Sequence, residues 1–111
     1  MDLETARFNM IEQQVRPWGV TDRWVLDLLK GVPREAFVSP SQRRLAFADL
    51  SLPIGFNETM WQPKIEARIL QAAAPLHADR VLEVGTGSGY LTALLAHQSA
   101  HVTSIEFRSA L

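Results

Sequence analysis

The stretch that decides the fold is Arg80-Val81-Leu82-Glu83-Val84-Gly85-Thr86-Gly87-Ser88-Gly89-Tyr90-Leu91. Its apolar run, Val81 to Val84, is typical of a buried strand. Glycine then occupies every second position of the loop, and apolar residues return at helical spacing between Leu91 and Ala96. A strand, a tight glycine loop and a helix in this order allow a ligand to approach the backbone and meet the amide groups of the helix N-terminus.

A second apolar run, Val102 to Ile105, ends at an acidic residue, Glu106, seventeen residues after Gly89. If the two runs are neighbouring parallel strands, their carboxyl ends meet at the same edge of the sheet. A carboxylate at that place can accept hydrogen bonds from ribose hydroxyls. The pattern therefore predicts an α/β protein in which the first two parallel strands of a Rossmann-like sheet are present.

The spacing of the glycines narrows the choice of ligand. The dinucleotide fingerprint needs glycine at the first, third and sixth positions of the loop, whereas Gly85, Gly87 and Gly89 are first, third and fifth and Tyr90 is sixth. No Gly-Lys-Ser or Gly-Lys-Thr follows, which excludes a phosphate-binding P-loop. A glycine turn with a ribose-binding acid but no pyrophosphate signature favours a mononucleoside ligand. The alternative is an ordinary strand-to-helix turn in which glycine serves only capping and packing.

Length and composition restrict the class of protein further. The 111 residues have room for one domain with one core, and 47% hydrophobic with 21% charged residues is typical of a globular chain. The net charge of −1 and the absence of a basic block argue against a nucleic-acid partner. No apolar run is long enough for a membrane span, and no secretory signal is visible. The chain has no cysteine, so a cytoplasmic location without disulfides or thiolate metal sites is expected.

Residues 1–75 are predicted to form a helical cap ahead of the sheet. The first helix should run from Leu3 to about Arg16, with Asp2 as its N-cap and with Phe8, Ile11 and Val15 on the buried face. Another long helix of the cap should run from Pro63 to about Ala74, because proline is favoured at the first helical position and Pro75 ends the pattern. Its inward residues are expected to be Ile65, Ile69, Leu70 and Ala73.

Between these helices, the segment 49–55 is predicted to be extended and 56–62 to be a loop ahead of Pro63. Trp18 and Trp24 are interpreted as core residues of the cap, while Trp61 is open to either a packing role or a role at a site. His97 and His101 have the spacing of a metal pair on a helix, but a strand should begin near His101. They are therefore interpreted as loop histidines, and no metal site is predicted.

Five blocks of sequence stand out along the chain: Val32-Pro33-Arg34-Glu35-Ala36-Phe37-Val38, Ala46-Phe47-Ala48-Asp49, Leu52-Pro53-Ile54-Gly55, Thr59 with Gln62-Pro63, and Val81 to Tyr90. In this order they resemble the protein-L-isoaspartate O-methyltransferase family, and the resemblance covers about residues 10 to 107. The resemblance implies a Rossmann-like methyltransferase that uses S-adenosyl-L-methionine in protein repair. Its acceptor would be the abnormal carboxylate exposed when asparagine or aspartate isomerises, in an isoaspartyl-containing protein or peptide.

The resemblance also implies roles for individual residues. Glu106 would accept hydrogen bonds from the ribose of the cofactor, and Thr59 would line the methyl-transfer site. A carboxylate acceptor has a reference pKa of about 4 and is ionised at neutral pH, so it needs no general base. Alignment and the exclusion of water would then carry the catalysis. Gly85, Gly87 and Gly89 would shape the turn beside the cofactor, and Glu83 would end the strand ahead of it. Together with Thr86 and Glu106, these residues would bind the cofactor.

One departure from the family pattern affects the acceptor. The family usually reads Gln-Thr-Ile-Ser, with the serine in the active site, where this chain has Glu58-Thr59-Met60-Trp61. An indole replaces a small hydroxyl, and the carboxylate of Glu58 would repel an isoaspartyl carboxylate. Three functions remain open: an isoaspartyl methyltransferase with Thr59 and Trp61 at the catalytic site, a paralogue with another acceptor, and a non-catalytic cofactor-binding or interaction module.

Only two strands of a larger sheet are visible in the sequence. We therefore expect the N-terminal part of a longer enzyme, with a cap and substrate-side loop in 1–75 and the start of the cofactor-binding domain in 76–111. The 111-residue chain by itself should be inactive. Its unpaired strand edges should lead either to association between copies or to disorder of the tail after about His97.

Overall fold

The computed structural model describes residues 2–55 and 57–106, and it begins with a helical region. The first helix, α1 (Leu3–Met10), runs directly into a π-helical turn, η1 (Ile11–Val15), and a 3-10 turn, η2 (Arg16–Trp18). Asp2 caps α1 as predicted, because its carboxylate accepts a hydrogen bond of 2.7 Å from an amide of the first turn. The helical elements that follow are α2 (Arg23–Gly31), η3 (Arg34–Phe37), η4 (Pro40–Leu45) and α3 (Pro63–Ala73).

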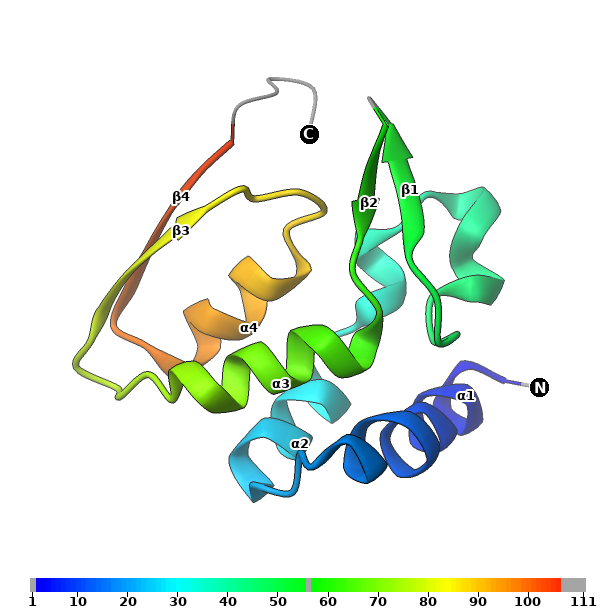
Figure 1. The fold of residues 1–111 in the computed structure, drawn as a ribbon, viewed down its shortest axis with the longest axis horizontal. Coiled ribbons are helices and arrows are strands. Elements are labelled where there is room, and N and C mark those ends of the chain that lie inside the picture. The colour runs from blue at the N-terminus through cyan, green and yellow to red at the C-terminus, as the bar shows by residue number, and fades with distance from the viewer. Residues whose placement is uncertain (1, 56, 107–111) are drawn as a thin grey trace.

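Two separate two-stranded sheets accompany the helices (Figure 1). The first is an antiparallel hairpin of β1 (Leu52–Gly55) and β2 (Glu58–Met60). The second is a parallel pair, β3 (Arg80–Val84) and β4 (His101–Ile105), which the helix α4 (Tyr90–Gln98) connects. The prediction of a Rossmann-like strand–helix–strand start after a helical region is confirmed.

The hairpin corrects the prediction that residues 56–62 form a loop. Glu58–Met60 is a strand, and its Met60 lies opposite Leu52 in the ladder. Gly55 and Asn57 have φ angles of 100° and 61°, which let the chain reverse between the two strands. The ladder has a register shift between Pro53 and Gly55, because proline lacks an amide to donate and glycine permits an irregular backbone there.

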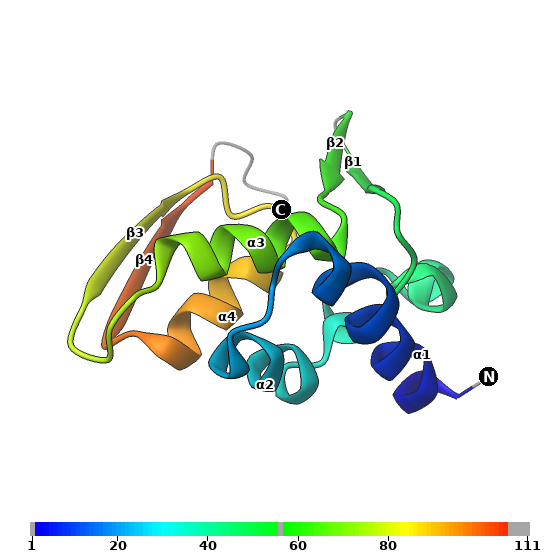
Figure 2. The same ribbon diagram turned by 60° about the horizontal axis from the view of Figure 1, so that its bottom comes forward.

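Among the described residues, the parallel sheet is covered on one side only. In both views α3 and α4 lie on the same side of β3 and β4 (Figures 1 and 2). On the sheet, Leu82, Val84 and Ile105 are 62%, 79% and 53% exposed, so an apolar surface faces solvent. Because β4 is formed, the expectation of a disordered tail is wrong for the described residues up to Glu106.

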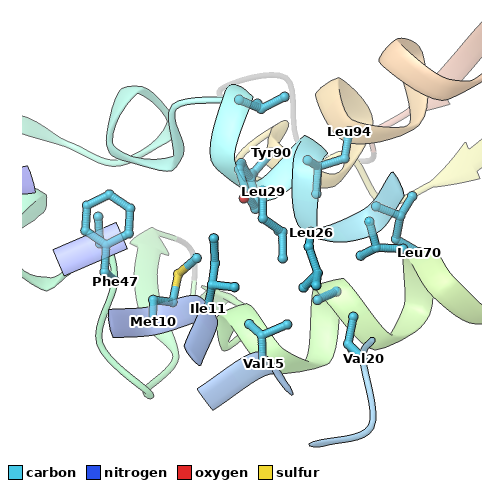
Figure 3. Packing of buried hydrophobic residues seen from close by; sticks show 14 of the residues in the cluster. Met10, Ile11, Val15, Val20, Leu26, Leu29, Phe47, Leu70, Tyr90 and Leu94 are labelled. Atoms are coloured by element: carbon cyan, nitrogen blue, oxygen red, sulfur yellow. The ribbon is translucent and has the colours of Figure 1, made fainter. Parts of the chain in front are cut away.

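The hydrophobic core lies among the helices rather than between a helix and the sheet (Figure 3). Its fully buried members come from every long helical element. Residues before and after position 76 share this single cluster. Representative members are Met10, Val15, Leu29, Leu70, Tyr90 and Leu94.

Four predicted core positions are wrong, and one of them is Ala73 of α3, which is exposed. Phe8 is 61% exposed, and Arg7 takes the buried position beside it because two carboxylates satisfy its guanidinium. In α3, Leu70 is buried as predicted, but Ile69 is 37% exposed and Glu66 lies inward. Trp18 is 44% exposed, and its ring lies beneath a lysine ammonium at 4.3 Å instead of in the core. A charged residue can occupy an interior position when it is paired there, which hydrophobic periodicity does not show.

Candidate active site

A cavity of about 780 Å³ opens at the carboxyl ends of β3 and β4 and extends to the β1–β2 hairpin. Seven of the eight predicted site residues line it, although they come from three separate segments of the chain. The eighth, Gly89, lies at the N-cap of α4. The predicted residues in the lining are Thr59, Trp61, Glu83, Gly85, Thr86, Gly87 and Glu106.

The glycine loop has the backbone shape that the sequence motif requires. Gly87 and Gly89 have φ angles of 57° and 87°, in the left-handed region that favours glycine. A Cβ at Gly89 would meet the ring of Phe37 at 3.8 Å, and one at Gly87 would meet Ile54 at 3.7 Å. These are ordinary contacts, so the need for glycine comes from the backbone angle rather than from a clash.

The acid at the end of β4 is held against the glycine loop. A carboxylate oxygen of Glu106 accepts a hydrogen bond of 2.8 Å from the amide of Gly87. The Gly85 amide donates to the Ile105 carbonyl at 2.7 Å, which carries the parallel pairing one step past the end of β3. The carboxylate is therefore oriented at the cavity before any ligand enters.

Glu83 is held in place by hydroxyl groups. Its Oε1 accepts hydrogen bonds from the hydroxyls of Thr92 on α4 and Ser104 on β4, the latter at 2.7 Å. The Ser104 hydroxyl also pairs with the Thr86 hydroxyl. Sequence reasoning missed Thr92 and Ser104. Alternation along β4 was the available signal, because Ser104 shares a face with Glu106 and lies opposite Glu83 in the ladder.

The wall opposite the glycine loop is formed by β2 and the residue after it. Thr59 is exposed and Met60 is buried, as alternation along a strand requires. The side chain of Trp61 is half exposed at the cavity, while its backbone carbonyl accepts a hydrogen bond of 2.8 Å from the buried Arg34. Arg34 was not among the predicted site residues, since a single arginine in a turn carries no motif.

Carboxylates dominate the charge of the cavity. Among its described lining residues are four glutamates and no lysine or arginine. Burial raises the pKa of Glu66, and the neighbouring Arg34 guanidinium, 2.7 Å away, opposes that rise. An acid-rich cavity favours a ligand that carries positive charge. The four glutamates in the cavity lining are Glu58, Glu66, Glu83 and Glu106.

The described residues hold neither a cluster of metal-ligating side chains nor a membrane-spanning helix. Within 2–55 and 57–106 no three histidine or acidic side chains gather closely enough to hold a metal ion. Both histidines are exposed, but their interpretation as loop residues is wrong, because His97 lies in the last turn of α4 and His101 begins β4. None of the helices in the same residues has the length and apolar character to span a bilayer.

The fold and the cavity define the class of protein. A parallel strand–helix–strand unit with a glycine loop, and with its cavity at the carboxyl ends of the strands, is the Rossmann-like arrangement in which ligands bind at that edge.

Comparison with known proteins gives the family. The family model described as protein-L-isoaspartate(D-aspartate) O-methyltransferase matches residues 6–111. A protein-L-isoaspartate O-methyltransferase 2 of Anaeromyxobacter sp. (strain Fw109-5) is 46% identical over 108 residues, which are 97% of this chain and 44% of that protein. A protein-L-isoaspartate O-methyltransferase of Methylorubrum extorquens (strain PA1) is 44% identical over 99% of this chain and 48% of its own length. The chain belongs to the protein-L-isoaspartate(D-aspartate) O-methyltransferase family.

A solved structure supports the fold. A crystal structure from Plasmodium falciparum, titled as a protein-L-isoaspartate O-methyltransferase in complex with S-adenosyl-L-homocysteine, superposes with a TM-score of 0.78. It is 21% identical and covers 100% of this chain and 51% of that structure's chain. The chain thus spans about half the length of the curated relatives it matches.

Proposed function

We propose that this protein, produced from its complete open reading frame, is an S-adenosyl-L-methionine-dependent methyltransferase that acts on isoaspartyl carboxylates in protein repair. One observation carries the proposal. The predicted cofactor residues, such as Gly87 and Glu106, and the predicted acceptor residues Thr59 and Trp61 line the same cavity. Membership of the family supports the assignment of the reaction.

The described residues fit the cofactor. The Glu106 carboxylate is an acceptor at the edge where ribose hydroxyls would donate, and the Gly87 amide fixes its direction. Gly85 leaves open space where a side chain would stand, so a ligand can approach the backbone. S-adenosyl-L-methionine, when bound, supplies a methyl group on a positively charged sulfonium, which the carboxylate-rich cavity suits.

Methyl transfer to a carboxylate requires the protein mainly to position the acceptor and the methyl group. An isoaspartyl carboxylate is already ionised at neutral pH, so no side chain has to remove a proton. The task of Thr59 and its neighbours is to hold that carboxylate in line with the methyl group and to exclude water. We assign residues 1–75 to this acceptor side and 76–111 to the cofactor side, and we assign the cysteine-free chain to the cytoplasm.

A second acceptor class is favoured by one observation. Glu58 and Trp61 both line the cavity, where a negative charge and an indole face the space expected for a carboxylate. A negative charge and an indole at this place are better suited to a paralogue that methylates a neutral or cationic acceptor. A non-catalytic module would bind the cofactor but methylate no acceptor.

Two measurements separate these functions. Isothermal titration of S-adenosyl-L-homocysteine should show saturable binding to the protein from the complete open reading frame, and weaker binding to the 111-residue chain. Labelled methyl transfer to an isoaspartyl peptide should then exceed transfer to the matched aspartyl peptide. Binding without transfer to either peptide would favour another acceptor or a non-catalytic module, and absence of binding would remove the proposal.

A further inference from the structure

Arg34 is a fully buried arginine that joins four segments of the chain. It is 1% exposed, and each of its nitrogen groups donates a hydrogen bond to a different segment. The Nε group donates to the Ala46 carbonyl at 2.7 Å, Nη1 to the Glu66 carboxylate at 2.7 Å, and Nη2 to the Trp61 carbonyl at 2.8 Å. The guanidinium carbon lies 4.8 Å from the ring centre of Tyr90.

Two of these partners line the cavity, and a third adjoins the glycine loop. Trp61 follows β2 on the acceptor wall, and Glu66 of α3 is also in the cavity lining. Tyr90 is the first residue of α4 and follows directly after Gly89, so its buried ring sets where the glycine loop meets the helix. One side chain therefore ties the acceptor wall to the cofactor loop.

We propose that Arg34 is a positioning residue for methyl transfer. Its side chain is not part of the cavity lining, so it acts through its partners and fixes the separation between the Trp61 backbone and the start of α4. A planar guanidinium is suited to this task, because it donates in three fixed directions and stacks on an aromatic ring at once. A lysine ammonium at the same place carries the charge but cannot reach three partners in one plane. The inference rests on the proposed function for its activity readout only.

Arg7 provides a matched control in the same molecule. It is also a buried arginine, 6% exposed, with carboxylate partners Glu4 and Glu35 at 2.5 and 2.6 Å and an aromatic ring, Phe47, at 5.1 Å. None of these three partners is in the lining of the cavity. Replacing Arg7 removes the same kind of buried interaction without releasing either wall.

The first test compares Arg34→Lys with Arg7→Lys in the protein from the complete open reading frame. Both changes should lower the Tm. Only Arg34→Lys should lower kcat, by at least tenfold, while the Kd for S-adenosyl-L-homocysteine changes less than threefold. Equal losses of kcat in the two arginine variants would overturn the inference.

A second measurement does not depend on activity. In protein labelled with 5-fluorotryptophan, single Trp→Phe changes assign the fluorine resonances of Trp18, Trp24 and Trp61. Arg34→Lys should shift and broaden the Trp61 resonance and leave the Trp24 resonance in place, whereas Arg7→Lys should leave Trp61 unchanged. An unshifted Trp61 resonance in Arg34→Lys would overturn the inference even if the proposed function holds. If the unaltered protein neither binds cofactor nor methylates peptides, the proposed function fails and this spectrum still decides the role of Arg34.

Discussion

Single residues in this cavity are held by partners from distant parts of the chain. Glu83 is bonded by hydroxyls of α4 and β4, Glu106 by a loop amide, and Glu66 by Arg34. Each carboxylate thus has a defined direction in the absence of ligand. Preorganised acceptors of this kind favour a cationic ligand without the cost of reorienting when it binds.

The ribose-binding role of Glu106 can be tested by substitution. Glu106→Ala should weaken binding of S-adenosyl-L-homocysteine by roughly 1.5–3 kcal/mol, because a charged acceptor is lost. Glu12→Ala, at a half-exposed site in η1, is the matched control and should leave titration curves unchanged. Equal affinity in the folded Glu106→Ala protein would remove this residue from the cofactor site.

Gly87 tests the shape of the loop. Gly87→Val should abolish or strongly weaken cofactor binding, because valine does not tolerate a φ of 57° and the loop must change shape. The amide that orients Glu106 would move with it. Gly31→Val is the control, since a Cβ there meets nothing within 4 Å and the residue is helical. A Gly87→Val protein that titrates like the unaltered one would contradict the assignment.

The acceptor preference depends on two side chains. Activity on isoaspartyl peptides should be weak, and Trp61→Ser with Glu58→Gln should raise it, because both cavity-lining groups that disfavour a carboxylate are then replaced. Labelled-methyl assays on the two proteins at equal concentration make the comparison. Robust methylation by the unaltered protein, with no gain in the double variant, would show that the departure is harmless.

At the scale of elements, one ion pair ties α1 to η3 and makes a pH dependence predictable. Burial would raise the pKa of Glu35, but its hydrogen bonds and charge interaction with Arg7 outweigh burial and hold the pKa below the ordinary 4.5. The folded state therefore binds fewer protons than the unfolded state near that pH. The contribution of the pair to stability is present above pH 4.5 and is lost as the pH falls through the lowered pKa.

Urea unfolding of the unaltered protein and of Glu35→Gln provides the check. Their difference in free energy of unfolding should be largest near neutral pH and should narrow as the pH falls below 4.5. Glu12→Gln, whose partner Arg16 is about half exposed, should show no comparable narrowing. If the difference in free energy of unfolding between the unaltered protein and Glu35→Gln stays constant with pH, the Glu35 carboxylate is not the group that causes the pH dependence.

At the scale of the whole molecule, the uncovered sheet face and the strand edges predict association of the 111-residue chain. A two-stranded sheet with an apolar face and unpaired edges is a template for another copy. Light scattering should give an apparent mass that rises with concentration. Val84→Lys should reduce the rise, and Leu45→Lys, an exposed apolar position away from the sheet, should not. A stable monomer with slow amide exchange through Val102 to Ile105 would contradict this prediction.

The sequence by itself determined the strand, glycine loop, helix and second strand, and with them the class of fold. These elements are local, since periodicity, glycine spacing and the acid after the second strand are all properties of neighbouring residues. Seven of the eight site residues that it predicted line the cavity, because motif residues at strand ends have little freedom in where they can go. Other lining residues, such as Glu66 and Ile69 of α3, were not predicted as part of the site.

Only the tertiary structure decided which charged residues are buried and what holds the site. The partners of Arg34 lie up to 56 positions away in the chain, at Tyr90, and no local pattern connects them. The same holds for Thr92 and Ser104 around Glu83, which become neighbours only when α4 and β4 are in place. Burial of a charge is favourable only when its partners arrive together, so the packed chain decides it rather than any single segment.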